Sequence, residues 1–82
     1  MLTSSDWNVI IAYADSSMSK VKAGAMCFMH ANTVKYHLNK VKQETNLNPD
    51  NFYDLYELVG MAVDELKKAF PELYKNNPLQ TF

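Results

Sequence analysis

Residues 31–44 carry side chains whose chemistry suits DNA recognition. Successive residues of a helix are about 100° apart, so amide and phenol groups with this spacing gather on one helix face, with lysines beside them. The predicted base-reading residues are Asn32, Thr33, Lys35, Tyr36, Asn39 and Gln43. Amides can bond the N6 and N7 edge of adenine in the major groove, and ammonium groups neutralise phosphates. The alternative is an ordinary solvated helix face, although asparagine is a poor helix former and is costly there.

The charges of the chain are unevenly distributed although its net charge is only −1. Residues 20–42 contain lysines but no acidic residue, whereas residues 43–65 contain acids but no basic residue. The basic segment is therefore expected to face a polyanion, with a solvated lysine face as the alternative. The predicted phosphate contacts are Lys20, Lys22, Lys40 and Lys42, and Lys35 could add another. All eight basic residues are lysine, which weakens bidentate recognition of phosphate or guanine.

Helical periodicity indicates the elements that would position these residues. A first helix is expected to begin after Ser4 or Ser5, either of which could cap it, and to stop at the polar residues 15–17. Its apolar face is formed by Trp7, Ile10, Ile11 and Ala14. A second helix is predicted over about residues 20–28, with Ser19 as its cap.

The third helix has an apolar side opposite to the base-reading residues. Val34, Leu38 and Val41 recur at helical spacing and are predicted to face the core, with His37 at the boundary. Residues 29–31 contain neither glycine nor proline, so the break before this helix is predicted to be a tight turn.

A longer amphipathic helix is predicted from Phe52 to Phe70. Asn51 and Asp54 resemble a capping box at its start. The apolar positions of this helix are Phe52, Leu55, Tyr56, Val59, Val63, Leu66 and Phe70, and Leu58 and Met61 widen the face. We expect most of this face to be core and part of its width to be available for a dimer contact.

The fold class predicted from these patterns is all-α, a helix-turn-helix bundle of about four helices plus a short C-terminal turn. Two glycines and three prolines are too few for a fold of many short strands. With 82 residues the chain has room for one core, so residues 1–82 are expected to form a single domain. Its ordered core would be about 5–74, its helix-turn-helix about 19–44, its last turn 71–74 and its frayed tail 76–82.

A short segment makes the prediction of a helix-turn-helix domain more specific. It is Phe28-Met29-His30-Ala31-Asn32-Thr33-Val34-Lys35-Tyr36-His37-Leu38-Asn39-Lys40-Val41. It resembles the C-terminal DNA-binding domain of bacterial transcription factors of the PucR and CdaR (sugar-diacid regulator) type. Their pattern is an apolar residue, His, any residue, Asn, Thr, Val or Leu, any residue, Tyr, Arg and Leu, then a basic residue and Ile or Val.

The resemblance implies that residues 31–44 form a recognition helix in the major groove of double-stranded DNA and that His30 caps this helix. It also implies an upstream sensory domain, so that the chain would be the excised output domain of a longer bacterial, cytoplasmic regulator. Three positions depart from the family pattern: His37 replaces an arginine, Gly24 is the small residue of the second helix, and Cys27 replaces a leucine. We expect the last two to loosen the second helix slightly.

Other chemistry has little support in the sequence. Cys27, His30 and His37 match no zinc-site spacing, so neither metal nor cofactor is predicted, and Cys27 is expected to be a small core residue. Asp64 and Glu65 are adjacent and point in different directions on a helix, and no nucleophile–base pair or phosphate loop occurs, so no enzymatic activity is predicted. A single cysteine favours a reducing, cytoplasmic setting. The sequence contains no apolar run of about 18 residues, so no membrane span is predicted.

Two functions therefore remain. The first is sequence-specific DNA binding as the output domain of a transcription regulator, which the amide and lysine face and the family motif favour. The alternative is a helical protein-interaction or dimerisation module without DNA contact, which the acidic segment 43–65 and the lack of arginine favour. The isolated domain is expected to be a monomer or a weak homodimer, because most of the apolar face of the longest helix is needed to cover the other helices.

Overall fold

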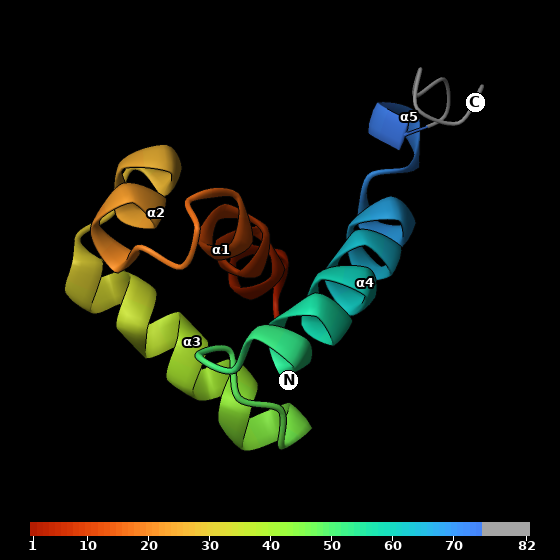
Figure 1. The fold of residues 1–82 in the computed structure, drawn as a ribbon. Coiled ribbons are helices and arrows are strands. Elements are labelled where there is room, and N and C mark those ends of the chain that lie inside the picture. Colours follow the sequence, from red (N-terminus) through yellow and green to blue (C-terminus); the bar gives the residue numbers. More distant parts are fainter. Residues whose placement is uncertain (75–82) are drawn as a thin grey trace.

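Helices make up most of the computed structural model, which describes residues 1–74 (Figure 1). They are α1 (Ser4–Asp15), α2 (Lys20–Cys27), α3 (Ala31–Thr45), α4 (Phe52–Ala69) and the short α5 (Pro71–Tyr74). No strand occurs among the described residues, and the predicted all-α class with four helices and a final short turn is confirmed. The predicted frayed tail, 76–82, lies outside the described residues.

Helix α1 is the centre of the fold. It packs against α2 and α3 on one side and against α4 on the other (Figure 1). Trp7 and Ile10 are buried as predicted, whereas Ile11 and Ala14 are only half-buried. Further buried positions on α1 are Asp6, Val9, Ala12 and Tyr13. A single apolar face underestimates the burial of α1, because three helices contact it from different directions.

The start of α1 differs from the prediction. Thr3, and not Ser4 or Ser5, is the N-cap: its side chain accepts a hydrogen bond from the backbone N–H of Asp6 at 3.3 Å. The Asp6 carboxylate accepts in return from the backbone N–H of Thr3 at 2.7 Å, which completes a capping box. Ser4 and Ser5 are the first residues of the helix itself.

The turn between α2 and α3 is as tight as predicted. Ser19 caps α2 as expected, and Phe28 ends it in the left-handed conformation with φ 56°. A Cβ atom on Gly24 would lie 2.5 Å from the carbonyl oxygen of Met29, so this close approach of the turn requires glycine. Gly24 therefore permits the turn that brings α3 against α2. The expected slight loosening of α2 stays a prediction.

Helix α4 buries a different face from the predicted one. Leu55 and Leu66 are buried as predicted, and Leu58 and Ala62 complete the buried face. Phe52 is 66% exposed and Tyr56 78% exposed, although both were expected in the core. Since α4 packs on α1 and not on α2 or α3 within residues 1–74, it has a narrower buried face than its apolar residues suggest.

The start of α4 also corrects a detail. Asn51 is the N-cap as predicted, and its side chain accepts from the N–H groups of Tyr53 and Asp54. Asp54 does not complete a capping box with Asn51, because its carboxylate accepts at 3.0 Å from the N–H of Asn48. This bond ties the preceding loop to the helix. None of the helices in the described part of the chain is both long and apolar enough to span a membrane.

Candidate nucleic-acid interface

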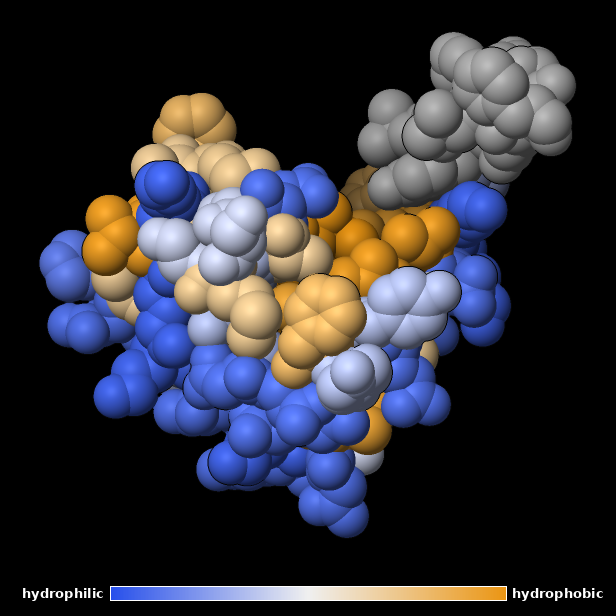
Figure 2. All heavy atoms as spheres, viewed as in Figure 1, coloured by the Kyte–Doolittle hydropathy of each residue, from blue (hydrophilic) through white to orange (hydrophobic). Residues whose placement is uncertain are grey.

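The exposed face of α3 is positioned by three buried side chains. Val34, Leu38 and Val41 are anchored in the core, as predicted. The opposite face of α3 must therefore point to solvent. All six predicted base-reading residues are exposed there: Asn32, Thr33, Lys35, Tyr36, Asn39 and Gln43. In the view of Figure 1, hydrophilic atoms cover the side formed by α3, and apolar atoms gather along α4 (Figure 2).

The beginning of α3 is held by His30. Its Nδ1 accepts a hydrogen bond from the backbone N–H of Asn32 at 3.1 Å, so the predicted cap is present. The carbonyl oxygen of His30 also accepts from the N–H groups of Thr33 and Val34. Because Nδ1 is an acceptor, the neutral imidazole carries its hydrogen on Nε2. Asn32 and Thr33 are thereby fixed in the first turn, at the end of α3 next to α2.

The predicted phosphate-binding lysines fall into two groups. Lys22 and Lys42 are exposed and, like Lys35, form no ion pair within residues 1–74. The Lys20 ammonium lies 3.3 Å from the Asp50 carboxylate and also donates to the Tyr13 hydroxyl. Lys40 donates to Asp6 at 2.9 Å. Two of the predicted phosphate contacts are therefore already bonded to groups of the chain itself.

The partner of Lys40 is a buried carboxylate that joins α1 to α3. Asp6 is fully buried. Its Oδ1 lies 2.7 Å from Nδ1 of His37, and its Oδ2 accepts from Lys40 and from the N–H and hydroxyl of Thr3. Burial alone raises the pKa of Asp6, but the hydrogen bonds from His37, Thr3 and Lys40 outweigh it, and the pKa falls from 3.8 to about 2. Asp6 is therefore ionised at neutral pH.

Sequence reasoning missed this contact. Asp6 stands in the first turn of a helix, where an acidic side chain is explained by the helix dipole alone. Its partners His37 and Lys40 lie more than thirty residues further along the chain. The only available signal was that His37 and Lys40, one helical turn apart, could serve one acceptor.

A second polar cluster ties α1, α2 and the loop before α4 together. The Tyr13 hydroxyl donates to Asp50, and the Lys20 ammonium lies over the Tyr13 ring. The hydrogen bond that Tyr13 donates lowers the pKa of Asp50, and the hydrogen bond and positive charge of Lys20 lower it further. Burial and the neighbouring Asp50 carboxylate raise the pKa of Tyr13. This cluster restrains Lys20, the first residue of α2, against α1 and the loop before α4.

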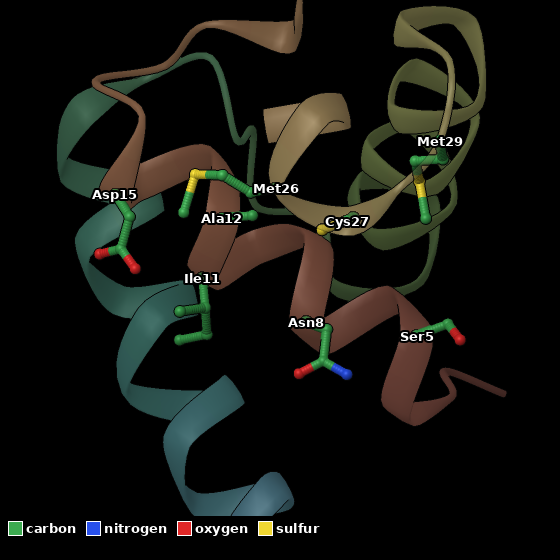
Figure 3. A pocket seen from close by; sticks show the side chains of 8 residues that line it. All are labelled: Ser5, Asn8, Ile11, Ala12, Asp15, Met26, Cys27 and Met29. Carbon is green, nitrogen blue, oxygen red and sulfur yellow. The ribbon is translucent and has the colours of Figure 1, made fainter. Parts of the chain in front are cut away.

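The pocket in Figure 3 does not contain the predicted DNA-binding residues. Its volume is about 350 Å³, and its side chains come from α1 on one side and from the end of α2 and the following turn on the other. The lining residues are Ser5, Asn8, Ile11, Ala12, Asp15, Met26, Cys27 and Met29. Cys27 is half-buried and packs on the core, and burial raises the pKa of its thiol. Within residues 1–74 no three His, Cys, Asp or Glu side chains are grouped as metal ligands.

Comparison with protein families decides what kind of helix-turn-helix this is. The family model of the PucR C-terminal helix-turn-helix domain matches residues 7–61. The chain belongs to this family. The match covers α1 from Trp7, the whole of α2 and α3, and α4 as far as Met61. Among curated proteins and solved structures there is no significant match.

Membership of the PucR helix-turn-helix family assigns the chain a DNA-binding regulatory role in general terms. In helix-turn-helix proteins the second helix of the motif lies in the major groove and the first crosses the DNA backbone. The family match includes both α2 and α3, which are joined by the tight turn at residues 28–30. Such families typically act by binding and not by catalysis.

Proposed function

We propose that this PucR-type domain binds double-stranded DNA with sequence preference and is the output domain of a transcription regulator. In this proposal α3 lies in the major groove. The observation that carries it is the exposed row of amides on α3, opposite the buried Val34, Leu38 and Val41 and inside a helix-turn-helix of the PucR family. A longer regulator would supply the upstream sensory domain and act in the cytoplasm.

The proposed division of roles follows the chemistry of each side chain. Asn32, Asn39 and Gln43 offer an amide donor and acceptor that can pair with adenine, while the Thr33 methyl and hydroxyl suit a thymine methyl or a phosphate. Tyr36 is 62% exposed and presents both an apolar ring and a hydroxyl, which suits a base edge or the sugar–phosphate backbone.

The main proposed phosphate contacts are lysines that form no ion pair within the described residues 1–74. Lys22 lies in the first turn of α2, Lys35 in the first half of α3 and Lys42 in its last turn, so they sit at both ends of the proposed reading face. Lys20 and Lys40 were also expected to bind phosphate. They would first have to leave Asp50 and Asp6, so we assign them a smaller share of the affinity.

The test separates reading of bases from attraction to phosphate. A duplex selected by the domain from a random library and a scrambled duplex of equal composition are titrated by fluorescence anisotropy. Asn39→Ala should lower affinity for the selected duplex and leave the scrambled one nearly unchanged, whereas Lys42→Ala should weaken both about equally. Equal effects of the two substitutions would show a non-specific surface, and absence of binding at low salt would overturn the proposal.

One observation favours the alternative of a protein-interaction module. An apolar groove of about 510 Å³ lies between the end of α1 and α4. It is lined by Ala14, Ser17, Met18, Phe52, Leu55, Tyr56 and Val59. A weak homodimer would use exposed residues such as Tyr56, because Leu58 is fully buried and Met61 lies at the edge of the buried face, 37% exposed. A dimer in sedimentation without any DNA binding would favour this second function.

A further inference from the structure

The Asp6 carboxylate makes more bonds than capping a helix requires. A capping box needs only the exchange with Thr3, which α1 has. Asp6 additionally accepts from His37 through Oδ1 and from Lys40 through Oδ2. An ionised carboxylate can only accept, so Nδ1 of His37 must carry a hydrogen and donate it. Two donors on α3 thus converge on one fully buried acceptor on α1.

The directions of these bonds restrict how α3 can turn about its own axis. Val34, Leu38 and Val41 hold α3 through apolar contacts, which have no preferred direction and tolerate small rotations. Hydrogen bonds weaken steeply when their angle or length changes. His37 and Lys40 are three residues apart and lie beside the apolar side chains of α3. Their hydrogen bonds therefore fix one side of the helix, while the apolar side chains fix the face toward the core.

A small rotation would be enough to disturb base recognition. Side chains of a helix end about 5–6 Å from its axis, so a turn of about 15° moves their tips by about 1.5 Å. This displacement exceeds the range of donor–acceptor distances over which a hydrogen bond forms. Whatever sets the rotation of α3 therefore sets which base edges the exposed amides can reach.

We propose that Asp6 is a positioning residue for the proposed DNA-reading helix: through His37 and Lys40 it fixes the rotation of α3 and so governs sequence preference, not overall affinity. The inference rests on the proposed function. Asp6 itself precedes the residues that match the PucR family, 7–61, so the family match does not contain it. Because Oδ2 also binds Thr3, the N-terminal residues and the reading face are joined through one carboxylate.

The experiment compares Asp6→Asn with Leu66→Ala. Asparagine keeps the shape of the side chain but loses the charge and turns one acceptor into a donor that faces other donors. Leu66 is buried in α4, away from α3, so its truncation destabilises the fold without touching the network. Both variants are studied at a temperature where circular dichroism shows them folded. His37→Phe, which keeps a ring but removes the Nδ1 donor, replaces Asp6→Asn if the latter does not fold.

Two readouts are taken on each protein. The first is the ratio of affinities for the selected and the scrambled duplex described above. The second is the orientation of α3 relative to α1 from residual dipolar couplings of the free protein, which does not depend on DNA. In Asp6→Asn we expect the ratio to fall about tenfold and α3 to rotate. Affinity for the scrambled duplex should stay the same or rise, because the substitution also releases Lys40 from its carboxylate partner. Leu66→Ala should keep the wild-type ratio and orientation.

The outcomes separate this inference from the proposed function. If Asp6→Asn leaves both the ratio and the orientation unchanged, or behaves like Leu66→Ala, Asp6 is not a positioning residue. If the wild type binds no duplex preferentially, the proposed function fails and the dipolar couplings alone decide whether Asp6 sets the rotation of α3. Rotation of α3 with an unchanged ratio would overturn the link to sequence preference.

Discussion

The residue with the strongest electrostatic consequence is Asp6. Its pKa of about 2 in the folded protein lies below the ordinary 3.8. As the pH falls, the Asp6 carboxylate is therefore protonated in the unfolded chain before it is protonated in the folded protein. The stabilisation of the fold by ionised Asp6 is fully present above about pH 4 and is lost as the pH falls through about 2. The shift corresponds to about 2 kcal/mol, since Asp6 is fully buried.

We expect urea denaturation to report this loss. Between about pH 5 and about pH 2 the free energy of unfolding of the wild type should fall by about 2 kcal/mol more than that of Asp6→Asn, which is less stable at pH 5 and lacks this titration. Subtracting the variant removes the contribution of other carboxyl groups, including Asp50. Parallel losses in the two proteins would show that Asp6 titrates normally.

A second residue-level prediction concerns the conformation of Phe28. Its φ of 56° is unfavourable for a large side chain, and the side chain is 97% exposed, so it gains little from burial. Glycine adopts this conformation without the steric cost. Phe28→Gly should therefore raise the free energy of unfolding by about 1 kcal/mol, as measured by urea denaturation. A loss of stability would mean that the Phe28 ring makes a contact that its exposure does not suggest.

At the level of elements, Gly24 and Gly60 have opposite environments. A Cβ at Gly24 would meet the Met29 carbonyl at 2.5 Å, whereas a Cβ at Gly60 would have no neighbour within 4 Å. Gly24→Ala should cost about 2 kcal/mol of stability, because the backbone between α2 and α3 must move. Gly60→Ala, the matched control in exposed helix, should instead gain about 1 kcal/mol. Thermal melts of both variants check this, and equal shifts would contradict the close approach at Gly24.

Helices α3 and α4 differ in how well their apolar periodicity predicts the buried face. Helix α3 has one apolar side and one polar side, so its period defined both the buried residues and the exposed face. Helix α4 has apolar residues over a wider arc than α1 can cover, so periodicity alone could not choose between Tyr56, which is exposed, and Ala62, which is buried. Alanine contributes little to such a pattern even where a helix packs closely on it.

The polar contacts were the least predictable part of the candidate site. His30 as a cap is a local interaction between neighbouring residues, and its sequence motif was sufficient to predict it. The bonds of Lys40 to Asp6 and of Lys20 to Asp50 join distant parts of the chain. Their geometry depends on how the helices pack, which composition and spacing do not specify.

For the molecule as a whole, these ion pairs change the expected dependence of DNA binding on salt. The basic segment carries five lysines, and if each contacted one phosphate, the slope of log K against log salt would be roughly −4 to −5. Lys20 and Lys40 already have carboxylate partners within the fold. A lysine that exchanges an internal carboxylate for a phosphate releases fewer counterions in total, because the freed carboxylate attracts cations again.

We therefore expect a slope of about −3, from Lys22, Lys35 and Lys42, when the scrambled duplex is titrated between low and moderate salt. Lys42→Met should reduce the magnitude of the slope by about 0.9, since it removes one contact. Lys20→Met is the matched control for a paired lysine, and it should leave the slope nearly unchanged. A wild-type slope near −4.5 that both substitutions reduce equally would show that DNA breaks the pair between Lys20 and Asp50. The polar cluster of Tyr13, Lys20 and Asp50 would then take part in the binding equilibrium, in addition to joining α1, α2 and the loop before α4.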